Sequence, residues 1–311
     1  MSLYLVTGGA GFIGSHIVRT LLARGQRVRV LDDLSSGKRE NLADIEPDIE
    51  LVVGDICELP TTRQCMAGVD AVFHLAARAS VPRSVEYPLP ANEVNVTGTL
   101  NLLLAARDAG VRRFIYSASS SAYGDTPTLP KREDMLPQPL SPYAISKLAG
   151  EHYCRAFSHC YGLQTVSLRY FNVFGPRQDP LSQYSAVIPA FVSRMVRGER
   201  PIVFGDGEQS RDFCYIDNVV NANLLALEAP QVRGEVANIA CGERVTLNEI
   251  TRLINRHLGT RIEPQYEPPR VGDVRHSLAD ISAARELLGY APRVMFADGL
   301  TRTLKWYARG P

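Results

Sequence analysis

The chain of 311 residues lacks several features that would assign it to whole classes of protein. Its six cysteines form no C-x-x-C pair, and none of its apolar runs reaches the ~20 residues that a membrane-spanning helix needs. No signal-peptide pattern precedes the first predicted strand. Lys and Arg number 34 against 33 Asp and Glu and are spread along the chain, which does not favour a nucleic-acid partner. We therefore expect a cytoplasmic protein with reduced thiols that binds neither nucleic acid nor membrane.

Paired metal-ligand spacing is also missing from the sequence. The six histidines are scattered, and His152 and His159 are more simply explained as one solvent-facing side of a helix. We expect no metal site.

What is present is an alternation of apolar, β-rich runs with helical patterns through the first half of the chain. The strands are predicted at Leu3–Thr7, Arg27–Leu31, Leu51–Val53, Ala71–Leu75, Phe114–Ser117 and Val166–Tyr170, and the helices at Phe12–Ala23, Thr97–Ala109 and Tyr143–Tyr161. This rhythm is typical of a Rossmann-type, doubly wound parallel sheet of the α/β class.

A glycine-rich turn joins the first predicted strand to the first predicted helix. Gly8, Gly11 and Gly14 let the backbone turn sharply and bring phosphate oxygens to the helix N-terminus, where free N–H groups favour an anion. The next strand ends in Asp32, which is placed to accept ribose hydroxyls and to repel the 2′-phosphate of NADP. NAD is therefore the expected cofactor, although Lys38 and Arg39 weaken the argument against NADP. Further cofactor contacts are expected from Phe12, Ile13, Asp55, Ile56, Leu75, Ala76 and Ala77.

The second half of the chain is organised differently. After Asn172, prolines and glycines become frequent and the alternation resumes only in pieces. We interpret residues 1–172 as the NAD-binding domain, with segments at about 213–242 that return to it. Residues from about 173 to 212 and from 243 to 311 are predicted to form a smaller, interleaved substrate domain.

Tyr143 and Lys147 are four residues apart at the start of a predicted helix, so they share one helix face. To act as a base near pH 7, a tyrosine must have its pKa lowered by about three units from about 10, which an adjacent ammonium and a nicotinamide cation could supply together. This spacing alone is typical of a solvated helix face. The triplet Ser119–Ser121, however, directly follows a strand, where hydroxyls project from the carboxyl edge of the sheet.

In these residues and the motifs around them, the sequence resembles the extended short-chain dehydrogenase/reductase family, and within it the UDP-glucose and UDP-N-acetylglucosamine 4-epimerases. The resemblance covers essentially the whole chain, through TGGAGFIGS at 7–15, HLAA at 74–77, SVPRS at 80–84, SSSAYG at 119–124, SPYAISK at 141–147, RYFNVFGP at 169–176, SRDFCYIDN at 210–218 and RVGDVRHS at 270–277.

The resemblance implies roles for individual catalytic residues. Tyr143 would be the base, and Lys147 its electrostatic partner and a contact of the cofactor ribose. Ser119 would bind and polarise the sugar O4, a role that Ser120 and Ser121 could share. The reaction implied is 4-epimerisation of a UDP-hexose through a transient 4-keto sugar, with tightly bound NAD.

The resemblance also implies substrate contacts. Asn172, Arg211 and Arg270 would reach the diphosphate, for which the planar fork of arginine is suited, and Asp273 a uridine ribose hydroxyl. Ser277 would border the C2 substituent of the sugar, where a small residue admits an N-acetyl group. Relatives often dimerise through the helices predicted at 97–109 and 143–161, so a homodimer is expected, although the apolar positions fit packing within one subunit equally well.

Three functions other than 4-epimerisation are compatible with a nucleotide-binding fold of this kind. A 4,6-dehydratase of this family carries Asp-Glu where this chain has Ser120 and Ser121, so elimination lacks its proton carriers. A UDP-glucuronate epimerase or decarboxylase stays open, because Arg83 could meet a sugar carboxylate. A non-catalytic NAD-binding protein would be expected to have lost Tyr143 or Lys147.

Overall fold

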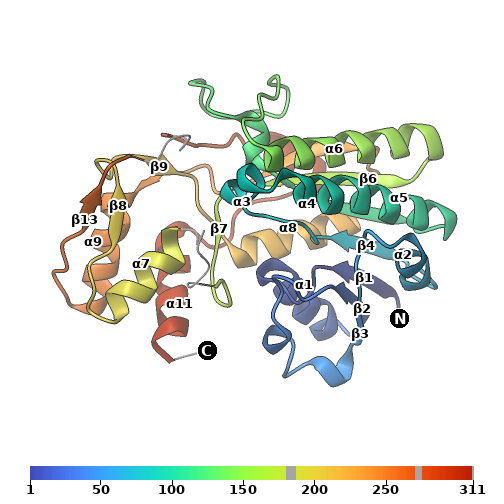
Figure 1. Cartoon of the computed structure of the whole chain (residues 1–311), viewed down its shortest axis with the longest axis horizontal. Coiled ribbons are helices and arrows are strands. Elements are labelled where there is room, and N and C mark those ends of the chain that lie inside the picture. The colour runs from blue at the N-terminus through green and yellow to red at the C-terminus, as the bar shows by residue number, and fades with distance from the viewer. Residues whose placement is uncertain (180–186, 270–274, 310–311) are drawn as a thin grey trace.

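The computed structural model describes residues 1–179, 187–269 and 275–309 (Figure 1). A seven-stranded parallel sheet occupies its centre, in the order β11-β6-β5-β4-β1-β2-β3. The strands are β1 (Leu3–Thr7), β2 (Arg27–Asp32), β3 (Glu50–Val53), β4 (Ala71–His74), β5 (Arg113–Ser119), β6 (Gln164–Tyr170) and β11 (Glu235–Ile239). The order reverses at β1, and this topology confirms the predicted Rossmann-type fold.

Helices cover both faces of the sheet. In β1, Tyr4 and Val6 belong to the apolar cluster on one face and Leu3 and Leu5 to the cluster on the other, as the two-residue period of a strand requires. One face carries α1 (Phe12–Ala23) and α8 (Ile216–Glu228), and the other carries α2 (Leu59–Cys65), α3 (Val81–Glu86), α4 (Pro88–Asn92), α5 (Thr99–Asp108) and α6 (Pro142–Tyr161).

The remaining described elements lie mainly beyond the carboxyl ends of the strands, where Figure 1 shows α7, α9, β8 and β13 grouped on the side away from the N-terminus. Three two-stranded sheets occur among them, formed by β7 with β10, β9 with β12, and β8 with β13. These elements are β7 (Val173–Phe174), α7 (Val187–Val196), β8 (Ile202–Phe204), β9 (Ser210–Arg211), β10 (Cys214–Tyr215), β12 (Val245–Thr246), α9 (Leu247–Leu258), β13 (Gln265–Glu267), α10 (Ser282–Leu288) and α11 (Phe296–Arg309). Among the described residues, no helix has both the length and the apolar character needed to cross a bilayer.

Two element boundaries differ from the sequence predictions in ways that affect the site. Strand β5 continues to Ser119, two residues past the predicted end, so the serine triplet begins on the strand and turns into a short 3₁₀ helix (Ser120–Tyr123). The helix predicted at 97–109 begins only at Thr99, because a π-helical turn (Glu93–Gly98) takes up its first two predicted residues. Such a turn widens a helix locally and often marks a functional site; here it contains the buried Asn95.

Candidate active site

The glycine-rich loop between β1 and α1 forms a cradle that side chains would fill. Gly8 has a φ of +68°, and a Cβ added to it would lie 2.7 Å from the backbone nitrogen of Ala76. A Cβ on Gly14 would lie 2.2 Å from the carbonyl oxygen of Gly8. No side chain caps the N-terminus of α1, and its first turn contains no acidic residue. These features leave the N–H groups of the first turn of α1 available to a phosphate group.

Asp32, at the carboxyl end of β2, is held firmly beside this loop. Its two carboxylate oxygens accept hydrogen bonds from the backbone N–H groups of Ala10 and Leu34, both at 2.9 Å. Burial raises the pKa of Asp32, and these two hydrogen bonds oppose the rise. The carboxylate still borders the adjoining cavity, so its remaining lone pairs can accept ribose hydroxyls.

All the residues predicted from the sequence to bind the cofactor line one cavity of about 450 Å³. The set comprises Gly8, Gly11, Phe12, Ile13, Gly14, Asp32, Asp55, Ile56, Leu75, Ala76, Ala77, Tyr143 and Lys147. The cavity runs along the carboxyl ends of β1, β2, β4 and β5, which is where open α/β sheets bind dinucleotides. The cradle, the uncapped helix and the acid at the end of β2 together fit NAD.

Helix α6 carries the tyrosine and lysine into this cavity. Its N-cap is Ser141, whose Oγ accepts a hydrogen bond from the N–H of Ala144 at 3.2 Å, and a proline follows the cap, as is typical of a helix start. The N–H of Tyr143 donates to Oγ of the buried Ser84 at 3.1 Å. The first turn of α6 is thereby tied to α3, through a serine of the SVPRS segment for which the sequence offered no individual role.

Burial has the largest effect on the pKa values of Tyr143 and Lys147. Burial raises the pKa of Tyr143, and a hydrogen bond with Ser119 opposes the rise. The ammonium of Lys147 lies 4.7 Å above the ring of Tyr116; burial lowers its pKa to about 8, against the opposing effect of Glu151. The phenol therefore keeps its proton until further positive charge enters the cavity, and a nicotinamide cation would supply that charge.

The three serines after β5 differ in position. Ser119 lines the cavity, and its Oγ accepts hydrogen bonds from the N–H of Ser121 at 3.2 Å and from the Ser121 hydroxyl at 2.8 Å. Ser120 and Ser121 are not among the residues that line the cavity. Of the three serines, the geometry therefore places only Ser119 at the cavity, with Ser121 orienting its hydroxyl.

A second cavity of about 270 Å³ meets the first at Asn172 and Val173. Asn172 has a φ of +33°, and its side-chain amide donates to the carbonyl of Asp212 at 2.9 Å and to Oγ of Ser277 at 3.2 Å. Arg211 lines the second cavity, with its guanidinium donating to the carbonyl oxygens of Ser210 and Arg275. Asn172, Arg211 and Ser277, which are far apart in the sequence, are thus brought together.

Two predicted substrate contacts, Arg270 and Asp273, lie outside the described residues. Within the described ranges, no group of three or more His, Cys, Asp or Glu side chains could hold a metal ion. His74, at the end of β4, is instead enclosed by the hydroxyls of Thr7 and Thr99, each 2.8 Å from one ring nitrogen. Burial, with a smaller effect of Lys147, lowers its pKa well below the usual value, so His74 is a neutral structural residue.

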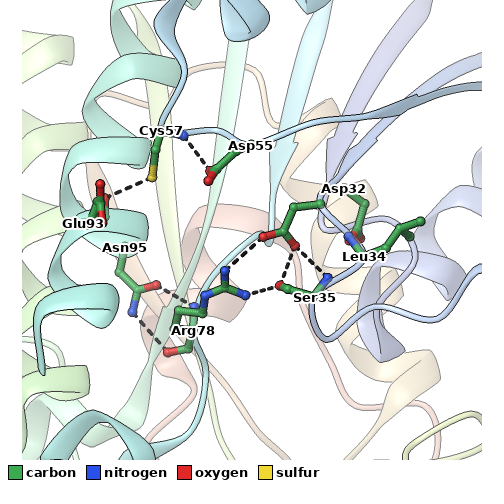
Figure 2. Close-up of polar contacts among 9 residues, drawn as sticks. Asp32, Leu34, Ser35, Asp55, Cys57, Arg78, Glu93 and Asn95 are labelled. Atoms are coloured by element: carbon green, nitrogen blue, oxygen red, sulfur yellow. Dashed lines mark hydrogen bonds and ion pairs between the residues drawn. The ribbon is translucent and has the colours of Figure 1, made fainter. Parts of the chain in front are cut away.

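The sequence did not single out several residues that the structure places in the cofactor cavity. Arg78, Asp33 and Ser35 line it together and interact with one another; Figure 2 shows the guanidinium of Arg78 beside Ser35. Arg78 lies 43 residues after Ser35 and 45 residues after Asp33, on a different loop. A local sequence pattern carries no signal for such a contact.

Comparisons with known proteins agree with this geometry. Residues 4–240 match the model of the NAD dependent epimerase/dehydratase family. The structure of a UDP-glucose 4-epimerase from Thermotoga maritima, determined with UDP-glucose, superimposes with a TM-score of 0.94 at 42% identity, covering 99% of both chains. A UDP-N-acetylglucosamine 4-epimerase from Methanobrevibacter ruminantium, in complex with UDP-N-acetylmuramic acid, gives 0.95 at 41% identity over 100% of this chain and 99% of the other. A UDP-glucuronic acid 4-epimerase from Bacillus cereus, with UDP-glucuronic acid and NAD, gives 0.90 at 32% identity over 99% of each.

Proposed function

Because this chain belongs to the NAD-dependent epimerase/dehydratase family, we propose that it is a UDP-hexose 4-epimerase. The favoured substrates are UDP-N-acetylglucosamine and UDP-N-acetylgalactosamine, with UDP-glucose and UDP-galactose as a second pair. One observation carries the proposal: the cavity that contains Tyr143, Lys147 and Ser119 opens at Asn172 onto a second cavity that contains Arg211. A dinucleotide and a sugar nucleotide can therefore meet at the tyrosine.

Each residue has a defined task in the proposed reaction. Tyr143 accepts the proton of the sugar O4 and later returns it, acting as general base and then general acid. Ser119 donates a hydrogen bond to O4, and Lys147 stabilises the phenolate. NAD, held by the glycine-rich loop and Asp32, supplies the hydride acceptor and then the hydride donor at C4. The 4-keto sugar turns over between the two steps, so no net oxidation results.

The nucleotide half of the substrate is assigned to the second cavity. Arg211 and Asn172 lie where they can meet a diphosphate, and the resemblance adds Arg270 and Asp273 to the diphosphate and the uridine ribose. Residues from about 173 to 212 and from 243 to 311 accordingly form the substrate domain in this proposal. The pairing of β11 beside β6 supports a return of residues 213–242 to the cofactor domain.

Ser277 is proposed to set the width of the pocket at the sugar C2 substituent. Ser277 itself lines neither of the two cavities, but its hydroxyl contacts Asn172, which borders both. A tyrosine at this position would direct a ring into the space beside Asn172. We expect Ser277→Tyr to lower kcat/KM for UDP-N-acetylglucosamine at least about 10-fold more than for UDP-glucose. Excluding the N-acetyl group from the pocket should raise the activation free energy by more than about 1.4 kcal/mol.

The control for this prediction is Ser277→Ala, which removes only the hydroxyl and should leave the ratio of the two specificity constants nearly unchanged. Both ratios are obtained from initial rates with each substrate. Equal losses on the two sugars in Ser277→Tyr would show that this residue does not select the C2 substituent.

The alternative of a uronate substrate is less well supported by the site. Arg83, the candidate partner of a sugar carboxylate, is exposed on α3 and lines neither of the two cavities described above. The test is to supply UDP-N-acetylglucosamine, UDP-glucose and UDP-glucuronate separately, without added cofactor, and to identify products by NMR. C4 epimers of the first two support the proposal. Conversion of the uronate alone would overturn it.

We further propose that the enzyme works in the cytoplasm as a homodimer. Apolar side chains are exposed on α3, on α6 and next to α4, among them Val85, Tyr87 and Ile145, at 63, 55 and 56%; several large apolar side chains exposed on neighbouring helices are typical of an interface. Light scattering on the purified protein should give a mass of about twice the 34.2 kDa chain. A mass of one chain at micromolar concentration would contradict the dimer.

A further inference from the structure

An ion pair spans the cofactor cavity at the end of β1. Strands β2 and β4 flank β1 on its two sides. Asp33 and Ser35 follow β2, and Arg78 follows β4. The guanidinium of Arg78 donates to Oδ2 of Asp33 at 3.0 Å and to the hydroxyl of Ser35. The two loops are therefore joined across the carboxyl end of β1, beside the glycine-rich loop.

The acidic side of this bridge is fixed by its own hydrogen bonds. Oδ1 of Asp33 accepts from the N–H of Ser35 at 3.0 Å and from its hydroxyl at 2.5 Å. Partial burial acts to raise the pKa of Asp33, but the Ser35 hydrogen bonds and Arg78 outweigh it and hold the pKa below its usual value. Asp33 is therefore a carboxylate in the pH range in which the enzyme works, with one oxygen turned to Arg78.

The basic side is fixed by the π-helical turn before α5. Oδ1 of Asn95 accepts from the N–H of Arg78 at 2.7 Å, and its amide nitrogen donates to the carbonyl of Arg78 at 3.2 Å (Figure 2). The same amide nitrogen donates to Oγ of Ser146 at 2.9 Å. Ser146 lies between Tyr143 and Lys147 on α6 and donates to the carbonyl of Tyr143 at 2.8 Å. Arg78 is thus anchored to the helix that carries the catalytic pair.

We propose that Arg78, Asp33 and Ser35 form a clasp that retains the dinucleotide and sets the rate at which NAD leaves the protein. All three line the cofactor cavity, and the side chains of Arg78 and Asp33 are only 33 and 31% exposed, so their attraction is less screened than that of a fully exposed pair. The clasp rests on the proposed function in one respect: an epimerase regenerates its cofactor in every cycle, so slow release of NAD does not limit turnover.

The test measures exchange of bound NAD without substrate. Protein loaded with NAD is mixed with an excess of isotopically labelled NAD, desalted at intervals and analysed by mass spectrometry. Arg78→Met and Asp33→Asn should each accelerate exchange by about fivefold, the scale of a partly screened ion pair. Added NaCl should accelerate exchange of the wild-type protein and have much less effect on Arg78→Met.

The double variant distinguishes a clasp from two separate cofactor contacts. If the two side chains act through their mutual bond, Arg78→Met/Asp33→Asn should exchange NAD about as fast as either single variant. The matched control is Arg132→Met, which removes an arginine paired with Asp134 at 2.8 Å on the surface, and should exchange at the wild-type rate.

Three results would overturn the clasp. They are an unchanged exchange rate in Arg78→Met, a double variant in which the two accelerations multiply, and a wild-type rate that salt does not alter. If Arg78→Met fails to fold, the exchange rate of Asp33→Asn and the effect of NaCl on the wild-type exchange rate still test the clasp. Unchanged exchange in a variant that epimerises UDP-hexoses contradicts the clasp alone. Accelerated exchange in a protein that epimerises neither UDP-hexose contradicts only the proposed function.

Discussion

Replacing Tyr143 with phenylalanine is expected to lower the turnover of UDP-hexoses by at least about 10²-fold, the usual scale for loss of a general base. The phenol lies in the cofactor cavity with Ser119 as a hydrogen-bond partner, and the substitution removes the group that we propose accepts the O4 proton. The glycine-rich loop and Asp32 are untouched, so NAD should stay bound. Measurement of kcat together with the NAD content of the purified variant tests both statements.

A matched control is available on the same helix. Tyr153 is also a tyrosine of α6, but it packs against the apolar cluster that contains Leu3 and Leu5 and lines neither of the two cavities described above. Tyr153→Phe should therefore keep nearly wild-type turnover. A near-wild-type rate in Tyr143→Phe would remove the proposed mechanism, whereas loss of NAD from that variant would assign the tyrosine to cofactor binding instead.

Replacing Gly14 with alanine is expected to weaken NAD binding by about 10- to 100-fold. In an unconstrained helix this change is stabilising by up to about 1 kcal/mol. Here the added Cβ would lie 2.2 Å from the carbonyl oxygen of Gly8 and 2.7 Å from Cα of Gly9, and both are backbone atoms of the loop that is predicted to receive the phosphates. The loop must move, at a cost of about 1–3 kcal/mol, and calorimetric titration with NAD measures the result.

The control for this change is Ser15→Ala, one residue further along α1. Ser15 is buried and its hydroxyl donates to the carbonyl of Phe12 at 3.0 Å, so the variant tests a small change in the same turn without adding volume. Its Kd for NAD should stay within about threefold of wild type, because one weak hydrogen bond is lost. An unaltered Kd in Gly14→Ala would show that phosphate binding does not depend on the close approach of Gly8 and Gly14.

The features that could be predicted from the sequence are those determined by residues that lie close together in the chain. The parallel strands, the glycine-rich turn and the positions of Asp32 and Tyr143 follow from residue periodicity and from motifs of less than ten residues. The structure confirms the predicted fold, and it gathers the predicted cofactor residues around one cavity. Their roles in binding and catalysis remain predictions that the variants described above test.

Other parts of the site depend on contacts between distant segments. The bond between Asn172 and Ser277 joins residues 105 positions apart, and Asn95 reaches Ser146 across 51 positions. No periodicity signals such contacts, because each depends on how the sheet and its crossover helices assemble. The π-helical turn was missed for a related reason, since an apolar helical period looks the same whether one turn is slightly widened or not.

The central claim is that a hydride leaves C4 and returns to the same carbon without leaving the protein. We would incubate the purified protein, without added cofactor, with UDP-N-acetylglucosamine that carries deuterium at C4, and follow the products by NMR in ordinary water. The account predicts that the C4 epimer appears with its deuterium retained at C4. Formation of the epimer with the deuterium lost to solvent, or no epimer from this substrate or from UDP-glucose, would contradict it.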